Sequence, residues 1–170
     1  MKEFDSDLFK IYESIYELNK VLEKLGKSKT IVYTYGVWDL FHPGHALLLS
    51  RAKKLGDFLI VGTVADAPVK KLKGDLRPVQ SQDDRIVTVG SLRFVDAAVH
   101  QKKYNPSDVL EKLFKVDILA KGDDWDYIPG QETIKSRGGN LVKLSYSINY
   151  SSSSLVSKMS GKRVKKNKEF

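Results

Sequence analysis

The sequence places two histidines, His42 and His45, directly after its first strong strand signal. Segment 31–35 (IVYTY) predicts a buried strand that ends at Gly36, and a helical pattern begins beside His45. A helix start offers free backbone N–H groups and the positive end of the helix dipole, which together bind anions. Two imidazoles there would add donors aimed at the same anion. This arrangement suits a phosphoryl group whose oxygens gain charge during transfer, so we predict a phosphate site here.

Two other interpretations of the histidine pair stay open at this stage. One histidine could cap the helix, or the pair could bind zinc. A zinc site is poorly supported, because the sequence has no cysteine and one further histidine, His100. Gly36 would let the backbone turn sharply or approach a ligand, and Gly44 lies between the two histidines at the helix start.

Strand-like and helix-like segments alternate along the chain, a pattern typical of a parallel sheet with helices on both faces. The predicted strands are 31–35, 58–64, 95–99, 116–120 and 141–144. The predicted helices are 45–55, 81–92, 106–114, 130–137 and 152–159. The predicted fold class is therefore α/β: a Rossmann-like, doubly wound, five-stranded parallel sheet. Because ligands bind at the carboxyl ends of such strands, the loops that should carry the site are 36–44, 65–80, 121–129 and 145–153.

An extra N-terminal helix is predicted in residues 1–29, ahead of a main domain at 30–160 and a basic, disordered tail at 161–170. Apolar residues spaced three and four apart favour a helix over 6–25, capped by Asp5 or Ser6 and ended by Gly26. The apolar stripe consists of Leu8, Ile11, Ile15, Leu18, Leu22 and Leu25. We expect this stripe to pack on the main domain, and pairing across a dimer is the alternative.

The charge balance is 29 basic against 21 acidic residues, a formal charge of +8, which suggests a polyanionic ligand. The tail contributes +4 of this, from five basic residues and one acidic residue. Nucleic-acid binding is the alternative that this tail raises, although no nucleic-acid partner is expected. The absence of cysteine excludes a thiolate nucleophile and a disulfide scaffold, and it fits a cytoplasmic protein. No apolar run approaches the ~20 residues of a membrane span, and charges throughout the first twenty residues argue against a signal peptide.

Six motifs occur in an order that resembles the cytidylyltransferase-like branch of the nucleotidyltransferase superfamily, over residues 30–159. They are TYGVWDLFHPGH, VADAPVKKLKGDLRPV, QDDR, RFVDAAV, KGDDW and NYSSSSLVSKM. The branch that makes FAD, NAD or coenzyme A precursors shares the histidine motif, but the serine-rich end and the GDDW loop argue against it. Segment 158–162 (KMSGK) superficially resembles the lysine loop of class I aminoacyl-tRNA synthetases, but the chain leaves no room for a tRNA-reading domain.

The resemblance implies that a nucleoside triphosphate reacts with a phosphorylated small molecule, releasing pyrophosphate, with Mg²⁺ accompanying the triphosphate. It also implies a homodimer. The attacking phosphate is already an anion, so the enzyme must position two polyanions rather than supply a base. TYG, DLFHPGH and GDDW resemble the enzymes that act on glycerol 3-phosphate, choline phosphate and ethanolamine phosphate, which slightly favours CTP as the donor.

The alternative is an ATP-dependent adenylyltransferase acting on a sugar phosphate such as heptose 1-phosphate. The leading helix, the Lys-Gly-x-x-Arg-Pro run and segment 128–142 (IPGQETIKSRGGNLV) resemble the enzymes that make ADP-heptose. Cytidylyltransferases usually carry Arg-Thr-Glu-Gly before the serine run, whereas this chain has Tyr-Ser-Ile-Asn at 146–149. The missing arginine weakens the assignment to CTP.

Matched residue by residue, the resemblance also assigns roles. The implied catalytic residues are His42, His45, Lys73 and Arg85, with Arg85 holding the β- or γ-phosphate. The implied nucleotide-binding residues are Gly36, Val37, Trp38, Gly44, Ser151, Ser152 and Ser153. The implied contacts to the acceptor or the base are Asp39, Asp66, Lys71, Asp123 and Trp125. No metal-binding side chain is assigned.

Plainer roles compete with several of these assignments. The lysines at 70–73 could be a solvated charge run within a loop, Arg85 a surface arginine, and the serines a polar linker or a helix cap. Asp39 is expected to orient the loop or a histidine rather than react, and Trp38 is expected to pack.

Overall fold

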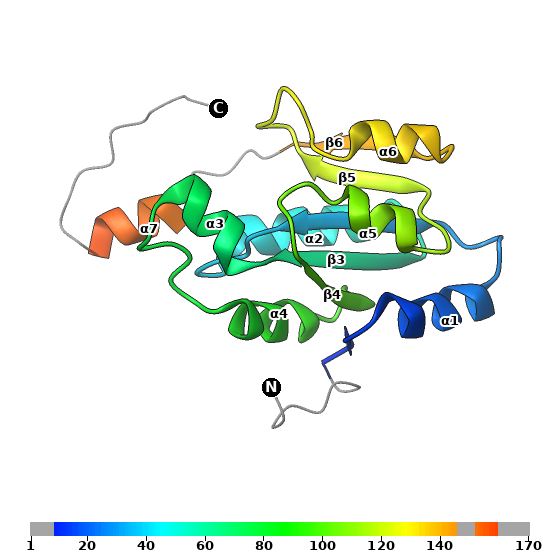
Figure 1. Ribbon diagram of the computed structural model, residues 1–170, viewed down its shortest axis with the longest axis horizontal. Coiled ribbons are helices and arrows are strands. Elements are labelled where there is room, and N and C mark those ends of the chain that lie inside the picture. The colour runs from blue at the N-terminus through cyan, green and yellow to red at the C-terminus, as the bar shows by residue number, and fades with distance from the viewer. Residues whose placement is uncertain (1–8, 146–151, 160–170) are drawn as a thin grey trace.

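The computed structural model describes residues 9–145 and 152–159 as strands and helices around one open parallel sheet (Figure 1). Its strand order is β1-β4-β3-β2-β5-β6. The strands are β1 (Ile11–Tyr12), β2 (Ile31–Gly36), β3 (Phe58–Val64), β4 (Ala97–Gln101), β5 (Ile118–Gly122) and β6 (Asn140–Leu144). The helices are α1 (Ile15–Leu25), α2 (Pro43–Lys53), α3 (Asp66–Lys73), α4 (Gln82–Gly90), α5 (Ser107–Lys112), α6 (Gln131–Ser136) and α7 (Ser152–Met159). The α/β, doubly wound architecture is confirmed.

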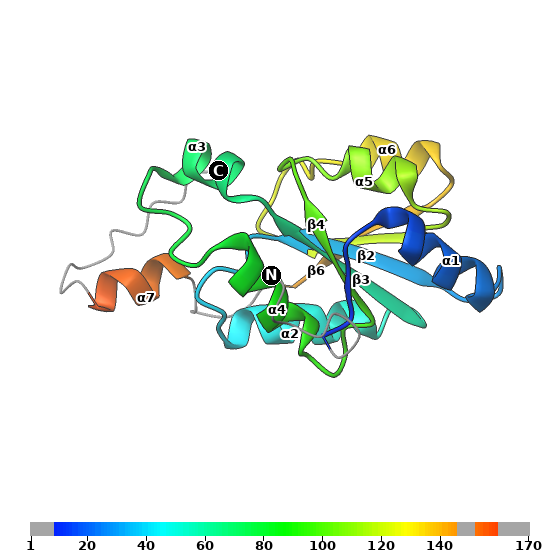
Figure 2. The same ribbon diagram turned by 60° about the horizontal axis from the view of Figure 1, so that its bottom comes forward.

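The two faces of the sheet carry separate helix layers, because neighbouring residues of each strand point to opposite sides. Tyr33 packs in one core with α1, α5 and α6. Val32 packs in the other with α2 and α4. Figure 2 shows these two layers on either side of the strands. The central strands β2 and β3 are almost wholly buried, which matches their continuous apolar sequence.

The N-terminal segment corrects the predicted helix over 6–25 and the predicted count of five strands. Its helix begins at Ile15, where the Ser14 hydroxyl accepts a hydrogen bond from the Glu17 N–H at 3.2 Å. Ahead of it, Ile11 and Tyr12 form a sixth strand that pairs in parallel with Ala98 and Val99. Backbone pairing at an open sheet edge therefore overrides the helical spacing of the first apolar residues. The proposed caps at residues 5 and 6 lie outside the described residues.

Helix α1 packs on the main sheet, as the first interpretation of its apolar stripe predicts. Leu18 and Leu22 are buried in the same core as Tyr33. Asn19 adds two hydrogen bonds to the end of α5, accepting from the Phe114 N–H and donating to the Lys112 carbonyl. Gly26 ends the helix with a φ of 78°, as predicted.

Segment 65–80, predicted as a loop, contains helix α3. Val69 buries its side chain while the lysines lie on the exposed side, and Gly74 ends the helix with a φ of 88°. One buried residue in a short, charged segment gives little apolar periodicity, so the sequence pattern did not show the helix. Figures 1 and 2 both place α3 and α7 together at one end of the sheet, where β2 and β3 finish. Among the described residues, no helix is long and apolar enough to span a membrane.

Candidate active site

A polar cavity of about 160 Å³ lies at the carboxyl ends of β2 and β5. Strand β3 lies on one side of β2 and strand β5 lies on the other, so the cavity is at the point where the strand order reverses. Open α/β sheets bind ligands at such a point. A second cavity of about 630 Å³ shares Lys73, Tyr104, Asp124 and Trp125 with the first, and its wall is mainly apolar. Of the predicted residues, the first cavity is lined by Gly36, Val37, Trp38, Asp39, His45, Lys73, Trp125 and Ser152.

The two histidines stack face to face at the start of α2. Their ring centroids are 3.7 Å apart with an interplanar angle of 20°. His42 occupies the helix-cap position, yet its side chain makes no capping hydrogen bond. The Nδ1 atoms of both rings are buried without a partner among the described residues. A buried polar atom without a partner is costly, which is expected where a ligand completes the bonding.

Burial lowers the pKa of both imidazoles from the ordinary value near 6.5. For His45, burial is the main cause, and the charges of His42, Lys73 and Lys121 lower the pKa further, to about 3. Both rings are therefore neutral at pH 7 in the free protein, and each can donate a hydrogen bond from one nitrogen.

Lowering the pH from 7.5 to 5.5 is expected to destabilise the unliganded protein through this pair. The unfolded histidines take up protons around pH 6.5, while folded His45, with a pKa of about 3, stays neutral and folded His42 takes up its proton at a lower pH than usual, so stability is lost as the pH falls. The loss is about 1.4 kcal/mol for each histidine that stays neutral. Urea unfolding at the two pH values measures it. Over this pH range His45→Gln should lose about 1.4 kcal/mol less stability than the wild type, and equal losses in both proteins would contradict this account.

The first turn of the site depends on Gly36 and Trp38. A side chain at Gly36 would meet the indole of Trp38 at 2.8 Å. The indole is buried and donates a hydrogen bond from Nε1 to the Gly62 carbonyl at 2.9 Å. Trp38 has a φ of 59°, so the loop turns in a left-handed conformation that bulky residues seldom adopt. Trp38 packs, as expected, and also lines the cavity.

Asp39 holds the loop between α3 and α4 against the histidine loop. Its carboxylate is 1% exposed, accepts hydrogen bonds from the Val79 and Gln80 N–H groups and pairs with Arg77 at 3.0 Å. This agrees with the expected orienting role toward the loop. The Ser152 hydroxyl donates to the Asp39 carbonyl at 2.6 Å, which brings the start of α7 to the same point. Ser151 lies outside the described residues, and so does the side chain of Ser153.

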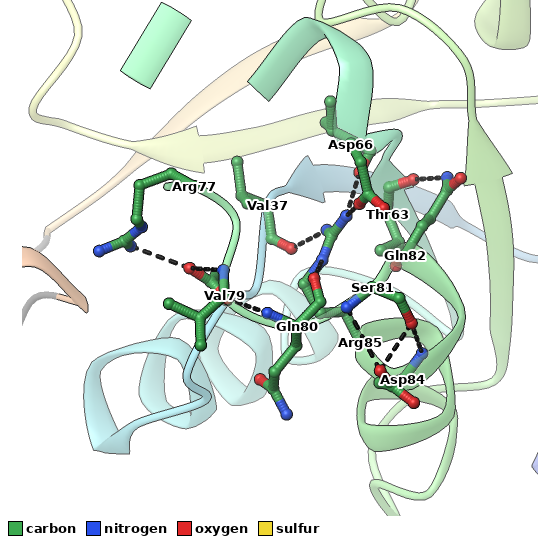
Figure 3. A network of polar contacts seen from close by, with 12 residues as sticks. Val37, Thr63, Asp66, Arg77, Val79, Gln80, Ser81, Gln82, Asp84 and Arg85 are labelled. Atoms are coloured by element: carbon green, nitrogen blue, oxygen red, sulfur yellow. Dashed lines mark hydrogen bonds and ion pairs between the residues drawn. The ribbon is translucent and has the colours of Figure 1, made fainter. Parts of the chain in front are cut away.

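Arg85 lines neither cavity, and its guanidinium lies among Val37, Asp66 and Gln80 (Figure 3). It is completely buried, and its nitrogens donate to the carbonyls of Val37, Val64 and Gln80 and to the Asp66 carboxylate. All of its nitrogens thus have protein partners. In this geometry Arg85 is neither a surface arginine nor a residue that reaches the cavity. Its guanidinium joins the histidine loop, the end of β3 and the loop before α4.

The remaining predicted residues divide between the two cavities and the surrounding structure. Lys73 lines both cavities, and desolvation, reinforced by Arg77, lowers its pKa. Lys71 lines the second cavity alone. Asp66 is paired with Arg85 and lines neither cavity. Gly44 is buried in the first turn of α2, and Asp123 is exposed beside Asp124, which is the carboxylate that lines both cavities.

The lining residues that were not assigned a role from the sequence include Arg77, Tyr104 and Lys121. Arg77 belongs to the Lys-Gly-x-x-Arg-Pro run, and Lys121 precedes the GDDW loop, so both stood inside recognised motifs. Tyr104 lies in no motif. Its ring faces that of Trp125 at 5.9 Å because β4 and β5 finish at the same edge of the sheet. The described residues contain no group of three His, Cys, Asp or Glu side chains that could hold a metal ion.

This fold, with a histidine pair at a helix start beside a cleft lined by cations, defines a class of α/β proteins that bind their ligands at the switch point of the sheet. The sequence profile described as cytidylyltransferase-like matches residues 33–158. The chain belongs to this family, and it is a nucleotidyltransferase.

The curated relatives include bifunctional HldE proteins. The protein from Campylobacter concisus (strain 13826) is 43% identical over 131 residues, which cover 77% of this chain and 26% of the relative. The protein from Helicobacter pylori (strain ATCC 700392 / 26695) is 40% identical over 149 residues, covering 87% and 31%. The chain thus spans about a quarter to a third of the length of these relatives.

Two solved structures share the fold. The lipopolysaccharide core biosynthesis protein from Thermoplasma volcanium GSS1 is 27% identical with a TM-score of 0.60, covering 69% of this chain and 97% of that one. A pantoate–β-alanine ligase from Francisella tularensis is 16% identical with a TM-score of 0.57, covering 79% and 66%. The second similarity concerns the fold alone.

Proposed function

We propose that the protein transfers an adenylyl group from ATP to a sugar phosphate such as heptose 1-phosphate and releases pyrophosphate. The observation that carries the reaction class is His45 at the start of α2, which lines a cavity with Lys73, Arg77 and Lys121 in its wall and stacks on His42, a residue that lines neither cavity. These groups are donors and cations without an acid–base pair. Such a set of groups is suited to binding two phosphate groups next to each other.

The attacking oxygen belongs to the phosphate of the acceptor, and it forms a bond to the α-phosphorus of ATP. The bond from that phosphorus to the bridging oxygen breaks, and pyrophosphate leaves with the electron pair. The helix N-terminus, His42 and His45 would stabilise the charge on the α-phosphate oxygens in this transition state. Asp39 holds Arg77 and the adjoining loop in place. Mg²⁺ would enter with the triphosphate and neutralise part of its charge.

The comparisons support ATP and a sugar phosphate better than the slightly favoured CTP. The sequence motifs are divided between the two interpretations, but the relatives include HldE proteins and a lipopolysaccharide core biosynthesis protein. A lipopolysaccharide core is built from sugars, so the second name fits a sugar acceptor. The absence of the arginine that cytidylyltransferases carry before the serine run points the same way.

The second cavity suits the organic part of the acceptor. Tyr104, Trp125, Leu72 and Pro68 give it a mainly apolar wall, and aromatic faces can pack against the C–H face of a sugar ring. Lys71, Lys73 and Asp124 supply charged groups for phosphate and hydroxyls. The acceptor would thus reach the first cavity through the residues that the two cavities share.

The proposal predicts that ATP plus heptose 1-phosphate gives the fastest pyrophosphate release in a panel of four nucleoside triphosphates and phosphorylated sugars, polyols and amino alcohols. We expect the rate with ATP to exceed that with CTP by at least tenfold. Coupled detection of pyrophosphate measures it, and His45→Ala in the same panel controls for contaminating enzymes. Faster release with CTP and glycerol 3-phosphate would overturn the choice of substrates, and no release with any pair would overturn the reaction. A homodimer and a cytoplasmic location remain predictions, and light scattering tests the first.

A further inference from the structure

We infer that Lys121 binds the phosphate of the acceptor, the group that carries the attacking oxygen. The inference rests on the proposed function, because it names the residue that would hold the nucleophile in that reaction. Lys121 is the penultimate residue of β5, at the carboxyl end of the sheet, and its side chain lines the first cavity.

The ammonium group of Lys121 is a buried charge without a counter-ion. The residue is 7% exposed, and among the described residues no carboxylate lies within 4.0 Å of its nitrogen. The Tyr35 carbonyl accepts one hydrogen bond from Nζ at 2.8 Å, which leaves two of its three N–H groups for a ligand. A buried cation normally has an ion pair, because removing it from water costs several kcal/mol. An anionic substrate would supply the missing charge.

Aromatic rings hold the ammonium group in place. Nζ lies 4.0 Å from the centre of the Tyr35 ring and 5.4 Å from that of Trp125. Such contacts offset part of the desolvation of a cation without neutralising it. Burial is the main cause that lowers the pKa of Lys121, to about 8. The nearby charges have opposite effects on this pKa, because Asp124 raises it and Lys73 lowers it. Lys121 therefore remains mostly charged at pH 7 and available to an anion.

The position of Lys121 favours the acceptor over the nucleotide. The helix N-terminus, His42 and His45 belong to α2, and the hydroxyl of Ser152 lies at the other end of the histidine loop. Lys121 stands across β2 from β3, next to Trp125, which belongs to both cavities. A phosphate on Lys121 could thus carry a sugar in the second cavity. It would also face the α-phosphate held at α2, as in-line attack requires.

The test compares Lys121→Met with Lys115→Met in the full chain. Both remove a partly or fully buried lysine near β5, but Lys115 lies before the strand and pairs with Asp117 at 3.2 Å. Calorimetry would measure binding of heptose 1-phosphate, inorganic phosphate and α,β-methylene-ATP, and urea unfolding would measure stability without ligand. For Lys121→Met we expect binding of heptose 1-phosphate to weaken about tenfold to a hundredfold, the effect of losing a charged hydrogen bond. Binding of the ATP analogue should change less than about threefold, because the interaction energy between separate contacts is small.

The unliganded stability gives a second, independent criterion. Lys121→Met should unfold at an equal or higher urea concentration than the wild type, because it removes an unpaired buried charge. Lys115→Met should unfold at a lower concentration and bind all three ligands like the wild type. A Lys121 variant that is destabilised and keeps its affinity for heptose 1-phosphate would overturn the inference. Equal losses of heptose 1-phosphate and ATP-analogue binding would also overturn the assignment to the acceptor.

Failure of the proposed function gives a different result. If the wild type releases no pyrophosphate from ATP and heptose 1-phosphate, that substrate pair is wrong. The role of Lys121 as a ligand of the acceptor phosphate is then tested by the binding of inorganic phosphate. Loss of phosphate binding in Lys121→Met, with unchanged stability, would support it. Unchanged phosphate binding would refute it.

Discussion

His45→Ala is expected to lower kcat by about 10²–10³, the usual effect of removing one preorganised donor to a developing negative charge. The ring lies in the wall of the cavity at the start of α2, stacked on His42 and in edge contact with Trp38 at 5.4 Å. Alanine leaves the backbone N–H groups of the helix start in place. Substrate binding should therefore weaken less than turnover, with KM changing by less than about tenfold.

Pyrophosphate release under saturating substrates, with KM for both substrates, measures this effect. His100→Ala is the matched control, since it is the remaining histidine, lies on β4 and lines neither cavity. Urea unfolding must show that His45→Ala remains folded. His42→Ala should show a similar loss of turnover. Turnover within about threefold of the wild type in a folded His45→Ala protein would refute the role of this histidine.

Arg85→Ala is expected to lower the free energy of unfolding by about 3 kcal/mol, in the lower range for breaking a buried ion pair. We use the lower range because Asp66, the partner carboxylate, is 36% exposed and can regain water. Three backbone carbonyls lose their donor as well, which adds to the cost. Chemical denaturation measures the loss. Arg93→Ala is the control, because Arg93 is exposed and its replacement should change stability by less than about 0.5 kcal/mol.

Arg85→Lys separates the two roles that sequence and geometry suggest for this residue. Lysine keeps the positive charge but lacks the fork that reaches several acceptors. If Arg85 positions the loops, Arg85→Lys loses stability and kcat, while KM for ATP rises by less than about tenfold. If it binds the triphosphate as the resemblance implies, KM for ATP rises further and stability is unchanged.

The sequence predicted the fold well where the segments are long and buried. The strand at Phe58–Val64 was predicted with its observed bounds, and the helix predicted over 81–92 is α4, which begins at Gln82 after a capping box of Ser81 and Asp84. Prediction failed at β1 and α3, which are short and have few buried residues. β1 exists because Ile11 and Tyr12 pair with an open strand edge 87 residues further along the chain, at Ala98 and Val99 (98 − 11 = 87, 99 − 12 = 87).

The same distinction applies to the site. Residues within one motif, such as His42 and His45, could be assigned together, because a helix start places them side by side whatever the rest of the chain does. Residues from separate segments could not. Tyr104 meets Trp125 because β4 and β5 end at the same edge of the sheet, although β3 and β2 lie between them, and Asp39 reaches Arg77 across 38 residues (77 − 39 = 38).

The sequence by itself therefore determined the family and the alternation of strands and helices, and it predicts phosphate chemistry at the histidine pair, since these depend on local order and residue type. The tertiary structure alone decided which charges face the cavity. Arg85 and Lys121 are both buried cations, yet Arg85 has a carboxylate and carbonyls around every nitrogen, whereas Lys121 has one carbonyl and an open cavity. Burial and hydrogen-bond partners depend on residues far apart in the chain. They distinguish Arg85, which holds loops together, from Lys121, which is available to an anionic ligand.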